Sequence, residues 1–193
     1  LGLDDIEAFP FVDAPDKRHI QDGVKLLEEL GAIQPKKIKS YKNDGARFPT
    51  RAQNLTAEST RQETRASEST EKKQGWELTS IGRQLAQLPV DPRLAKMLLS
   101  AVDFGSVYEV MIIVSALSIQ DPRERPTEKQ QASDEKHRRF ADKKSDFLAL
   151  LNLWNYVQEQ QKELTKNQFR RQCQKDFLNY LRIREWQDIY QQI

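Results

Sequence analysis

The chain has 193 residues, of which 37% are hydrophobic and 31% charged, so it is less apolar and more charged than an average globular domain. This length allows one large or two small domains, and no apolar run reaches the roughly 18 residues of a membrane-spanning helix. A single cysteine excludes an internal disulfide and a cysteine-rich metal site, and no secretory signal opens the chain, so we expect a cytoplasmic protein. Because the sequence begins without methionine and stops within a helical pattern, we expect a fragment.

The first 33 residues predict two short helices. One spans about 4–9 and ends at Pro10, and the other spans about 16–30 and ends at Gly31. This region carries eight acidic residues against three basic ones. Such an acidic surface suits protein docking better than contact with nucleic acid.

Residues 34–75 differ sharply from what precedes them. They are rich in Ser, Thr, Gln and charge, with ten basic residues against five acidic ones, and contain almost nothing apolar to bury. We therefore expect a long polar insertion, whose basic charge is a candidate contact for nucleic acid. A short strand over 76–79 and a helix over about 80–88, before Pro89, follow it. This order predicts a winged-helix unit over residues 1–89, with the insertion in its wing hairpin.

From residue 90 onward the pattern is entirely helical. Asp91 followed by Pro92 starts a helix that ends at Gly105, and the apolar segment from Val107 to Ser118 predicts a central buried helix. A loop rich in Arg and Pro spans 120–126, and further helices are expected at about 127–140, 146–161 and 166–191, the last one bent near Asn179. The sequence thus predicts a mainly α fold, with a helical bundle over residues 90–193 behind the winged-helix unit.

Motifs for catalysis are absent from the chain. There is no phosphate-binding loop, GxSxG, HExxH or CxxC motif, and neither histidine, His19 or His137, has a His or Cys at ligand spacing. Cys173 follows two arginines but lies near Phe169 and Phe177, which favours packing over reactivity. We predict no catalytic residue, no metal site and no cofactor in this chain.

Three segments resemble the helicase-associated region of DEAH-box RNA helicases. The run LTSIGRQLAQLPVDPRLAKMLLSA is similar to the family pattern LTxLGRxLAxLPxDPxLAKML, and the opening GLDDIEAFPFVDAPDKRHIQDGVKLLEELGAI resembles the start of the family's winged helix. The stretch VMIIVSALSIQDPRERPTEKQQASDEKHRRFADKKSDFLALLNLWNY and the ending FLNYLRIREWQDIYQQI resemble the bacterial HrpA-type members. Only the 34–75 insertion departs from the family pattern.

The resemblance implies a winged helix followed by a helical ratchet bundle, which together form one wall of a single-stranded RNA channel. Two RecA-like lobes, which would bind ATP and Mg²⁺ and drive 3′-to-5′ movement, and an OB-fold would lie elsewhere in the parent chain as its partners. No membrane contact is implied. The fragment itself would not be an enzyme.

Phosphate gripping without sequence reading requires Lys and Arg at loop and helix ends. The candidates for nucleic-acid binding are Arg123, Arg125, Lys129, Arg138, Arg139, Arg182 and Arg184. The residues that match the family pattern best are expected to set the junction between winged helix and ratchet, with Arg93 pairing with an acid across it: Gly82, Pro89, Asp91, Pro92 and Arg93.

Other interpretations stay open at this stage. Arg125 is equally suited to buttress its loop by capping a helix C-terminus, and the aromatic residues Trp154, Tyr156 and Trp186 fit a core better than base stacking. Instead of RNA binding, the whole unit is also compatible with a docking scaffold that touches no nucleic acid. A DNA-reading winged helix is the third alternative, although its recognition helix over 16–30 is acidic.

Overall fold

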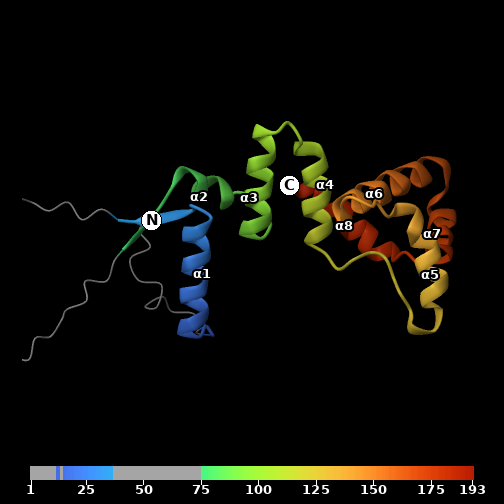
Figure 1. The fold of residues 1–193 in the computed structure, drawn as a ribbon, viewed down its shortest axis with the longest axis horizontal. Coiled ribbons are helices and arrows are strands. Elements are labelled where there is room, and N and C mark those ends of the chain that lie inside the picture. The colour runs from blue at the N-terminus through green and yellow to red at the C-terminus, as the bar shows by residue number, and fades with distance from the viewer. Residues whose placement is uncertain (1–11, 14, 37–74) are drawn as a thin grey trace, which may run out of the picture.

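The computed structural model describes residues 12–13, 15–36 and 75–193, and these form an elongated, mainly helical molecule (Figure 1). The winged-helix part lies at one end, a pair of antiparallel helices occupies the middle, and a helical bundle forms the other end. The helix predicted at 4–9 and nearly all of the insertion lie outside the described residues. Within the described residues no helix combines the length and apolarity needed to cross a membrane.

The winged-helix part begins with α1 (Lys17–Glu29), which Asp16 caps by accepting a hydrogen bond from the amide of Arg18 at 3.3 Å. Gly31 ends the helix with a positive φ of 69°, as its position in the sequence predicts. Strands β1 (Ile33–Pro35) and β2 (Trp76–Leu78) then pair antiparallel, with Ile33 opposite Leu78. The insertion therefore connects the two strands of a wing hairpin, as predicted.

Helix α2 (Ser80–Leu85) packs through Gly82 against Ala32, in the turn between α1 and β1. The Thr79 hydroxyl donates to the carbonyl of Gly31 at 2.6 Å and accepts from the amide of Gly82 at 2.9 Å, which joins β2, α2 and the end of α1. A Cβ at position 82 would collide with the main-chain carbonyl of Ala32, which cannot move aside as a flexible side chain can. Glycine is therefore required here for close approach rather than for its φ angle.

Substituting Gly82→Ala should lower the free energy of unfolding by about 2 kcal/mol because the added methyl overpacks this contact. The matched control is Gly23→Ala in α1, where nothing lies within 4 Å of the new Cβ and the lower helix cost of alanine should raise stability slightly. Urea unfolding followed by circular dichroism measures both changes. Equal effects of the two substitutions would contradict the close-approach role of Gly82.

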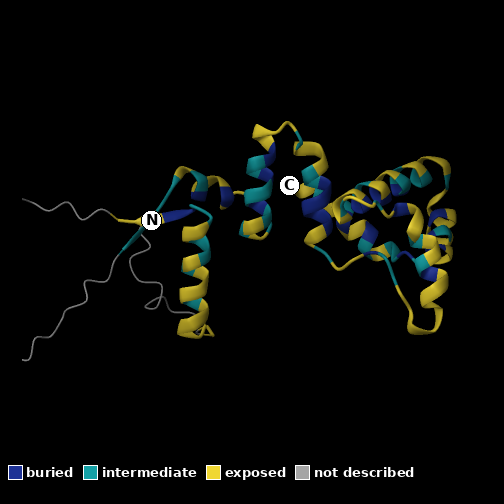
Figure 2. Ribbon diagram, viewed as in Figure 1, coloured by how far each residue is buried: buried dark blue, intermediate teal, exposed yellow. Residues whose placement is uncertain are grey.

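The rest of the chain forms six α-helices and two short 3-10 helices in the described part. In order these are α3 (Pro92–Asp103), α4 (Val107–Leu117), η2 (Thr127–Lys129), α5 (Gln130–His137), η3 (Arg138–Phe140), α6 (Asp146–Glu163), α7 (Lys166–Lys175) and α8 (Tyr180–Gln192). Helix α4 is the most apolar, and its residues from Ile112 to Ala116 are all buried between α3, α6 and α8 (Figure 2). The predicted central buried helix is thus confirmed.

Two clusters of buried side chains form the core. The larger one joins α4, α6, α7 and α8 around fully buried Leu153, Ile183 and Trp186. The smaller one joins α2 and α3 to the end of α1, and includes Ala95 of α3 with Leu99 packed against it. Helix α3 also supplies Met97 to the edge of the larger cluster. A single helix therefore takes part in both cores.

Several predicted helices have different limits in the structure. The helix expected over 80–88 ends at Leu85, and the one expected over 127–140 is broken into η2, α5 and η3. The single bent helix expected over 166–191 is two separate helices. Phe177 adopts a positive φ of 54°, and the amide of Leu178 donates to the carbonyl of Cys173 at 2.8 Å, which closes α7 as a glycine usually does. The Asn179 side chain then caps α8 by accepting from two of its amides.

Candidate nucleic-acid interface

The seven predicted phosphate-binding cations do not lie on one surface. Two bond to Asp121 of the 118–126 loop, one is paired with a buried acid, three surround α5, and one lines a groove between α6 and α8. Arg123 and Arg182 bond to Asp121, and Arg139 is paired with the buried acid. The residues around α5 are Arg125, Lys129 and Arg138, and the residue in the groove is Arg184.

Arg123 and Arg182 hold the 118–126 loop in place. The Arg123 guanidinium forms a salt bridge with Asp121 at 2.7 Å, and Arg182 donates to the main-chain carbonyl of Asp121 at 2.9 Å. Burial alone would raise the pKa of Asp121, but the hydrogen bonds from Arg123 outweigh it and lower that pKa. Both guanidinium groups therefore bond to the protein itself, which makes them poor candidates for phosphate contact.

The same loop is bound to the turn between α7 and α8. The amide of Glu124 donates to the carbonyl of Phe177 at 2.8 Å, and the amide of Asn179 donates to the carbonyl of Pro122 at 2.7 Å. The Asn179 side-chain amide also donates to the Glu124 carboxylate at 2.8 Å. These main-chain bonds make the loop a rigid part of the bundle.

Arg139 is paired with the buried carboxylate of Asp176. Its Nη2 lies 2.9 Å from Asp176 Oδ2, and its guanidinium stacks on the rings of Phe140 and Tyr156 at 4.7 and 4.3 Å. The Tyr156 hydroxyl and the Gln172 amide donate to the same carboxylate at 2.6 and 2.8 Å. Arg139 thus closes a polar network that ties η3 and α6 to the end of α7.

Asp176 is only 1% exposed, so its charge state matters for the fold. Burial by itself would raise the pKa of this carboxyl, but the hydrogen bonds from Tyr156, Arg139 and Gln172 together hold that pKa below its usual value. Nearby, burial raises the pKa of the Cys173 thiol to about 12, which makes it a packing residue and not a nucleophile.

Three candidates surround α5 and remain accessible. Arg125 forms an exposed salt bridge with Asp134 at 2.6 Å, and its hydrogen bond lowers the pKa of that carboxyl. This pairing replaces the helix-capping role that was the alternative for Arg125. Lys129 and Arg138 are exposed and form no ion pair with any described residue. We call Arg125, Lys129 and Arg138 the α5 cations.

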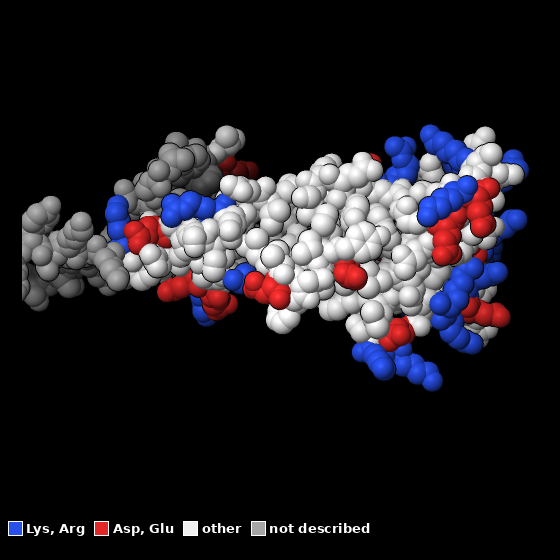
Figure 3. Space-filling model, turned by 90° about the horizontal axis from the view of Figure 1, so that it is seen from above, with Lys and Arg blue, Asp and Glu red and all other residues white. Residues whose placement is uncertain are grey.

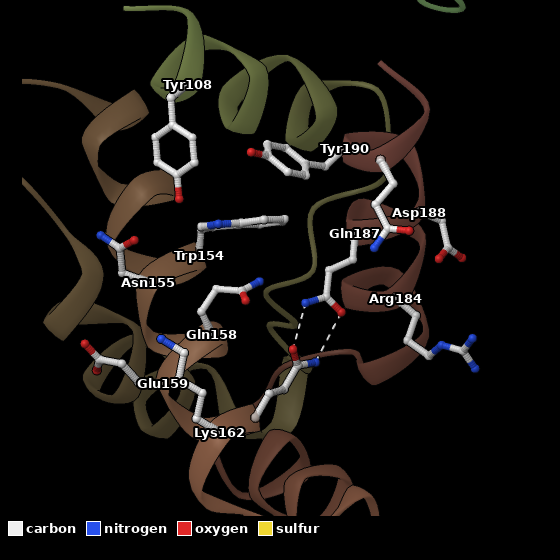
Figure 4. Close-up of a pocket in the computed structure, with 12 residues that line it drawn as sticks. Tyr108, Trp154, Asn155, Gln158, Glu159, Lys162, Arg184, Gln187, Asp188 and Tyr190 are labelled. Carbon is white, nitrogen blue, oxygen red and sulfur yellow. Dashed lines mark hydrogen bonds between the residues drawn. The ribbon is translucent and has the colours of Figure 1, made fainter.

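Arg184 lies in a groove of about 690 Å³ between α6 and α8 (Figure 4). Tyr108, Trp154 and Tyr190 gather at one end of it, and the side-chain amides of Gln161 and Gln187 donate to each other at 3.1 and 2.8 Å. The charged residues of its lining cancel in sign: Lys162 and Arg184 against Glu159 and Asp188. A groove without net charge is a poor phosphate site.

The aromatic residues considered for base stacking mostly belong to the core, as the helical spacing favours. Trp154 is 4% exposed and Trp186 is completely buried, with its indole Nε1 donating to the carbonyl of Ile112 and to the hydroxyl of Ser115, both at 3.0 Å. Tyr156 is half-buried under Arg139. None of these rings is free to stack a base.

Four of the predicted junction residues lie where the chain enters α3: Pro89, Asp91, Pro92 and Arg93. Asp91 caps α3 by accepting from the amide of Arg93 at 2.8 Å, and Pro92 is the first residue of that helix, as predicted. Gly82 instead belongs to the contact between α2 and Ala32, and exposed Pro89 precedes the turn into α3. The predicted acidic partner of Arg93 is not found, because its guanidinium forms no ion pair with the described part of the chain.

Sequence reasoning placed a bend near Asn179 but missed Asp176 and the capping role of Asn179, the two polar residues that organise the turn between α7 and α8. Both stand in the run KDFLN, which has no glycine or proline to mark the end of a helix. Asn or Asp directly before the first residue of a helical pattern is a usable capping signal, and Asn179 occupies that position before α8. Among the described residues no cluster of three or more metal-binding side chains occurs.

Comparison with known proteins identifies the family. Residues 91–150 match the helicase associated domain (HA2), ratchet-like. Over all 193 residues the chain is 72% identical to an ATP-dependent RNA helicase HrpA homolog of Haemophilus influenzae and 58% identical to ATP-dependent RNA helicase HrpA of Escherichia coli, and it spans 12% of the length of each. It is also 40% identical over 77 residues to the pre-mRNA-splicing factor ATP-dependent RNA helicase prp22 of Schizosaccharomyces pombe, which is 40% of this chain and 7% of that protein. The chain therefore belongs to the DEAH-box RNA helicase family, in which it corresponds to the segment that carries the HA2 domain.

Proposed function

We propose that the chain is the accessory module of an ATP-dependent 3′-to-5′ RNA helicase, where it forms one wall of a single-stranded RNA channel and docks on RecA-like lobes. The observation that carries this proposal is identity over the entire chain to two proteins named ATP-dependent RNA helicase. ATP and Mg²⁺ would be bound by the RecA-like lobes of the parent protein, and the module itself would catalyse no step.

The α5 cations are the residues that we propose for phosphate contact. Unlike Arg139, whose guanidinium bonds a buried acid, Arg125, Lys129 and Arg138 present their charge to solvent. The Arg125–Asp134 salt bridge is exposed, and such pairs contribute little to stability, so a phosphate can compete for this guanidinium. Contacts of this kind grip the backbone without reading sequence.

Docking on other domains is supported by the turn between α3 and α4. Phe104 is 82% exposed, Val102 63% and Tyr108 56%, an unusual concentration of large apolar groups in solvent. A DNA-reading winged helix has less support, because α1 exposes Asp22, Glu28 and Glu29. These acids would repel DNA phosphates.

The test compares two charge-matched variants of this chain in binding a fluorescent single-stranded RNA, measured by anisotropy at several salt concentrations. One replaces the α5 cations: Arg125→Gln, Lys129→Gln and Arg138→Gln. The control replaces one exposed lysine and two exposed arginines of the winged-helix part: Arg18→Gln, Lys25→Gln and Arg83→Gln. We expect the first set to weaken binding about tenfold. The plot of the logarithm of the binding constant against the logarithm of the salt concentration should also become less steep by about two, since each lost phosphate contact contributes about 0.7 to its slope.

The control should change affinity much less. If both triple variants lose the same affinity, attraction is a general charge effect and the α5 cations are not the contact. If the unmodified chain binds no single-stranded RNA at low salt, the channel-wall role is wrong, and docking through the α3–α4 turn becomes the better description of the module.

A further inference from the structure

Helix α7 carries a concentrated positive charge that the proposed RNA channel does not use. Its ten residues include four cations and no acid: Lys166, Arg170, Arg171 and Lys175. All four are exposed, and none forms an ion pair with any residue of the described chain. Figure 3 shows Lys and Arg gathered at the end of the molecule that α5 and α7 form, with some Asp and Glu among them, while the middle of the molecule is largely uncharged.

These charges do not serve the stability of the helix. Lys166 and Arg170 are four residues apart, as are Arg171 and Lys175, so each pair places like charges next to each other on the helix surface. Lys166 also stands in the first turn, where the helix dipole disfavours a cation. Only Lys175, at the C-terminal end, is placed favourably. The helix is instead held by its buried side chains, Phe169 and Cys173, and by the capping box of Thr165.

The two acids that flank α7 in the sequence form no ion pair with its cations. The carboxylate of Asp176, the next residue after α7, is buried and bonded to Arg139, Tyr156 and Gln172. Glu163, which precedes α7, is exposed and forms no salt bridge with any of the described cations. Four positive charges are therefore presented along a helix of about 15 Å, at 1.5 Å per residue.

The exposed surface of α7 carries no aromatic ring on which a base could stack. Proteins that hold single-stranded RNA combine cations with exposed aromatic rings on which bases stack. The one aromatic residue of α7, Phe169, is 3% exposed, and the uncharged exposed residues are amides: Asn167, Gln168 and Gln174. Cations and amides without rings suit double-stranded RNA, which proteins contact through phosphates and 2′-hydroxyl groups.

We propose that α7 is a second RNA-binding surface, which contacts the backbone of double-stranded RNA through Lys166, Arg170, Arg171 and Lys175. This inference rests on the proposed function, because a helicase that moves along a single strand also meets the duplex ahead of it. It adds to that function a contact on another helix, with another form of RNA.

The experiment measures binding of this chain to a 20-base-pair RNA duplex and to an unstructured single-stranded RNA of 20 nucleotides. The test variant carries Lys166→Gln, Arg170→Gln and Arg171→Gln, and its matched control is again Arg18→Gln, Lys25→Gln and Arg83→Gln, which removes the same number of lysines and arginines. We expect the α7 variant to bind the duplex about tenfold more weakly and to keep its single-strand affinity within about threefold. For the duplex, the slope of the logarithm of the binding constant against the logarithm of the salt concentration should become less steep by about two to three. Its melting temperature should equal or exceed that of the unmodified chain, since like-charge pairs are removed.

Each other outcome has a defined meaning. If the duplex affinity is unchanged, or if the control lowers it equally, α7 is not a duplex surface. If single-strand affinity falls as much as duplex affinity, α7 belongs to the single-strand path, which also overturns the inference. If polyglutamate displaces the duplex as effectively as unlabelled duplex RNA does, the surface fits an acidic protein instead. The α5 variant separates this inference from the proposed function, because that variant should weaken single-strand binding while the α7 variant should not.

Discussion

Substituting Trp186→Ala should lower the free energy of unfolding by about 4 kcal/mol, the largest effect that we expect from a single truncation in this chain. The indole is completely buried in the larger core cluster, 5.0 Å from the ring of Trp154 between centroids. Its Nε1 also donates to α4, at Ile112 and Ser115. Truncation therefore leaves a cavity at the point where α8 packs on both α4 and α6. Urea unfolding followed by far-ultraviolet circular dichroism measures the change.

Trp186→Phe separates packing from hydrogen bonding. Phenylalanine keeps most of the apolar volume but removes the donor to Ile112 and Ser115, so we expect a loss of about 1–2 kcal/mol. A loss below about 1 kcal/mol for Trp186→Ala would show that the neighbouring helices collapse into the cavity, and that α8 is not fixed by this side chain.

Substituting Asp176→Ala should lower the free energy of unfolding by about 3 kcal/mol at neutral pH, because the donors that surround this buried carboxylate lose their acceptor. The Tyr156 hydroxyl loses its acceptor, the Gln172 amide keeps only its longer bond to that hydroxyl at 3.4 Å, and Arg139 keeps its charge with partial access to water. Asp134→Ala is the control, since Asp134 pairs with Arg125 in an exposed salt bridge and should matter far less.

The effect of Asp176→Ala should depend on pH in a defined direction. The pKa of Asp176 in the folded chain lies below that of an unfolded aspartate, which is about 3.9. A depressed pKa means that the carboxylate stabilises the fold fully above about pH 4, and that this stabilisation is lost as the pH falls through the folded value. The free-energy difference between the unmodified chain and Asp176→Ala should therefore shrink in acid. A difference that grows as the pH falls would show that the folded pKa is raised instead.

The parts of the fold that sequence predicted correctly are those with local signals. Gly31 after an apolar repeat, and Asp91 before Pro92, mark helix ends by their own chemistry, and both act as predicted. The apolar segment that became α4 has too few polar residues to lie on a surface, so its burial follows from composition.

The sequence indicated a bend near Asn179, but the complete break between α7 and α8 could not be read locally. Phe177 occupies a left-handed position that sequence patterns assign to glycine, and it is held there by bonds to the 118–126 loop, more than 50 residues earlier. Contacts between residues far apart in the sequence also decide which of the candidate cations are available for binding. Arg138 and Arg139 are adjacent and chemically identical, but only the fold shows that Arg139 meets Asp176 while Arg138 faces solvent.

The position of α3 in two cores has a mechanical consequence. Ala95 and Leu99 pack toward the winged-helix part while Met97 packs toward the bundle, so α3 is held by both parts. We therefore expect a displacement of either part to be transmitted to the other through α3. The two parts should accordingly move as a single body when a partner pushes on one of them.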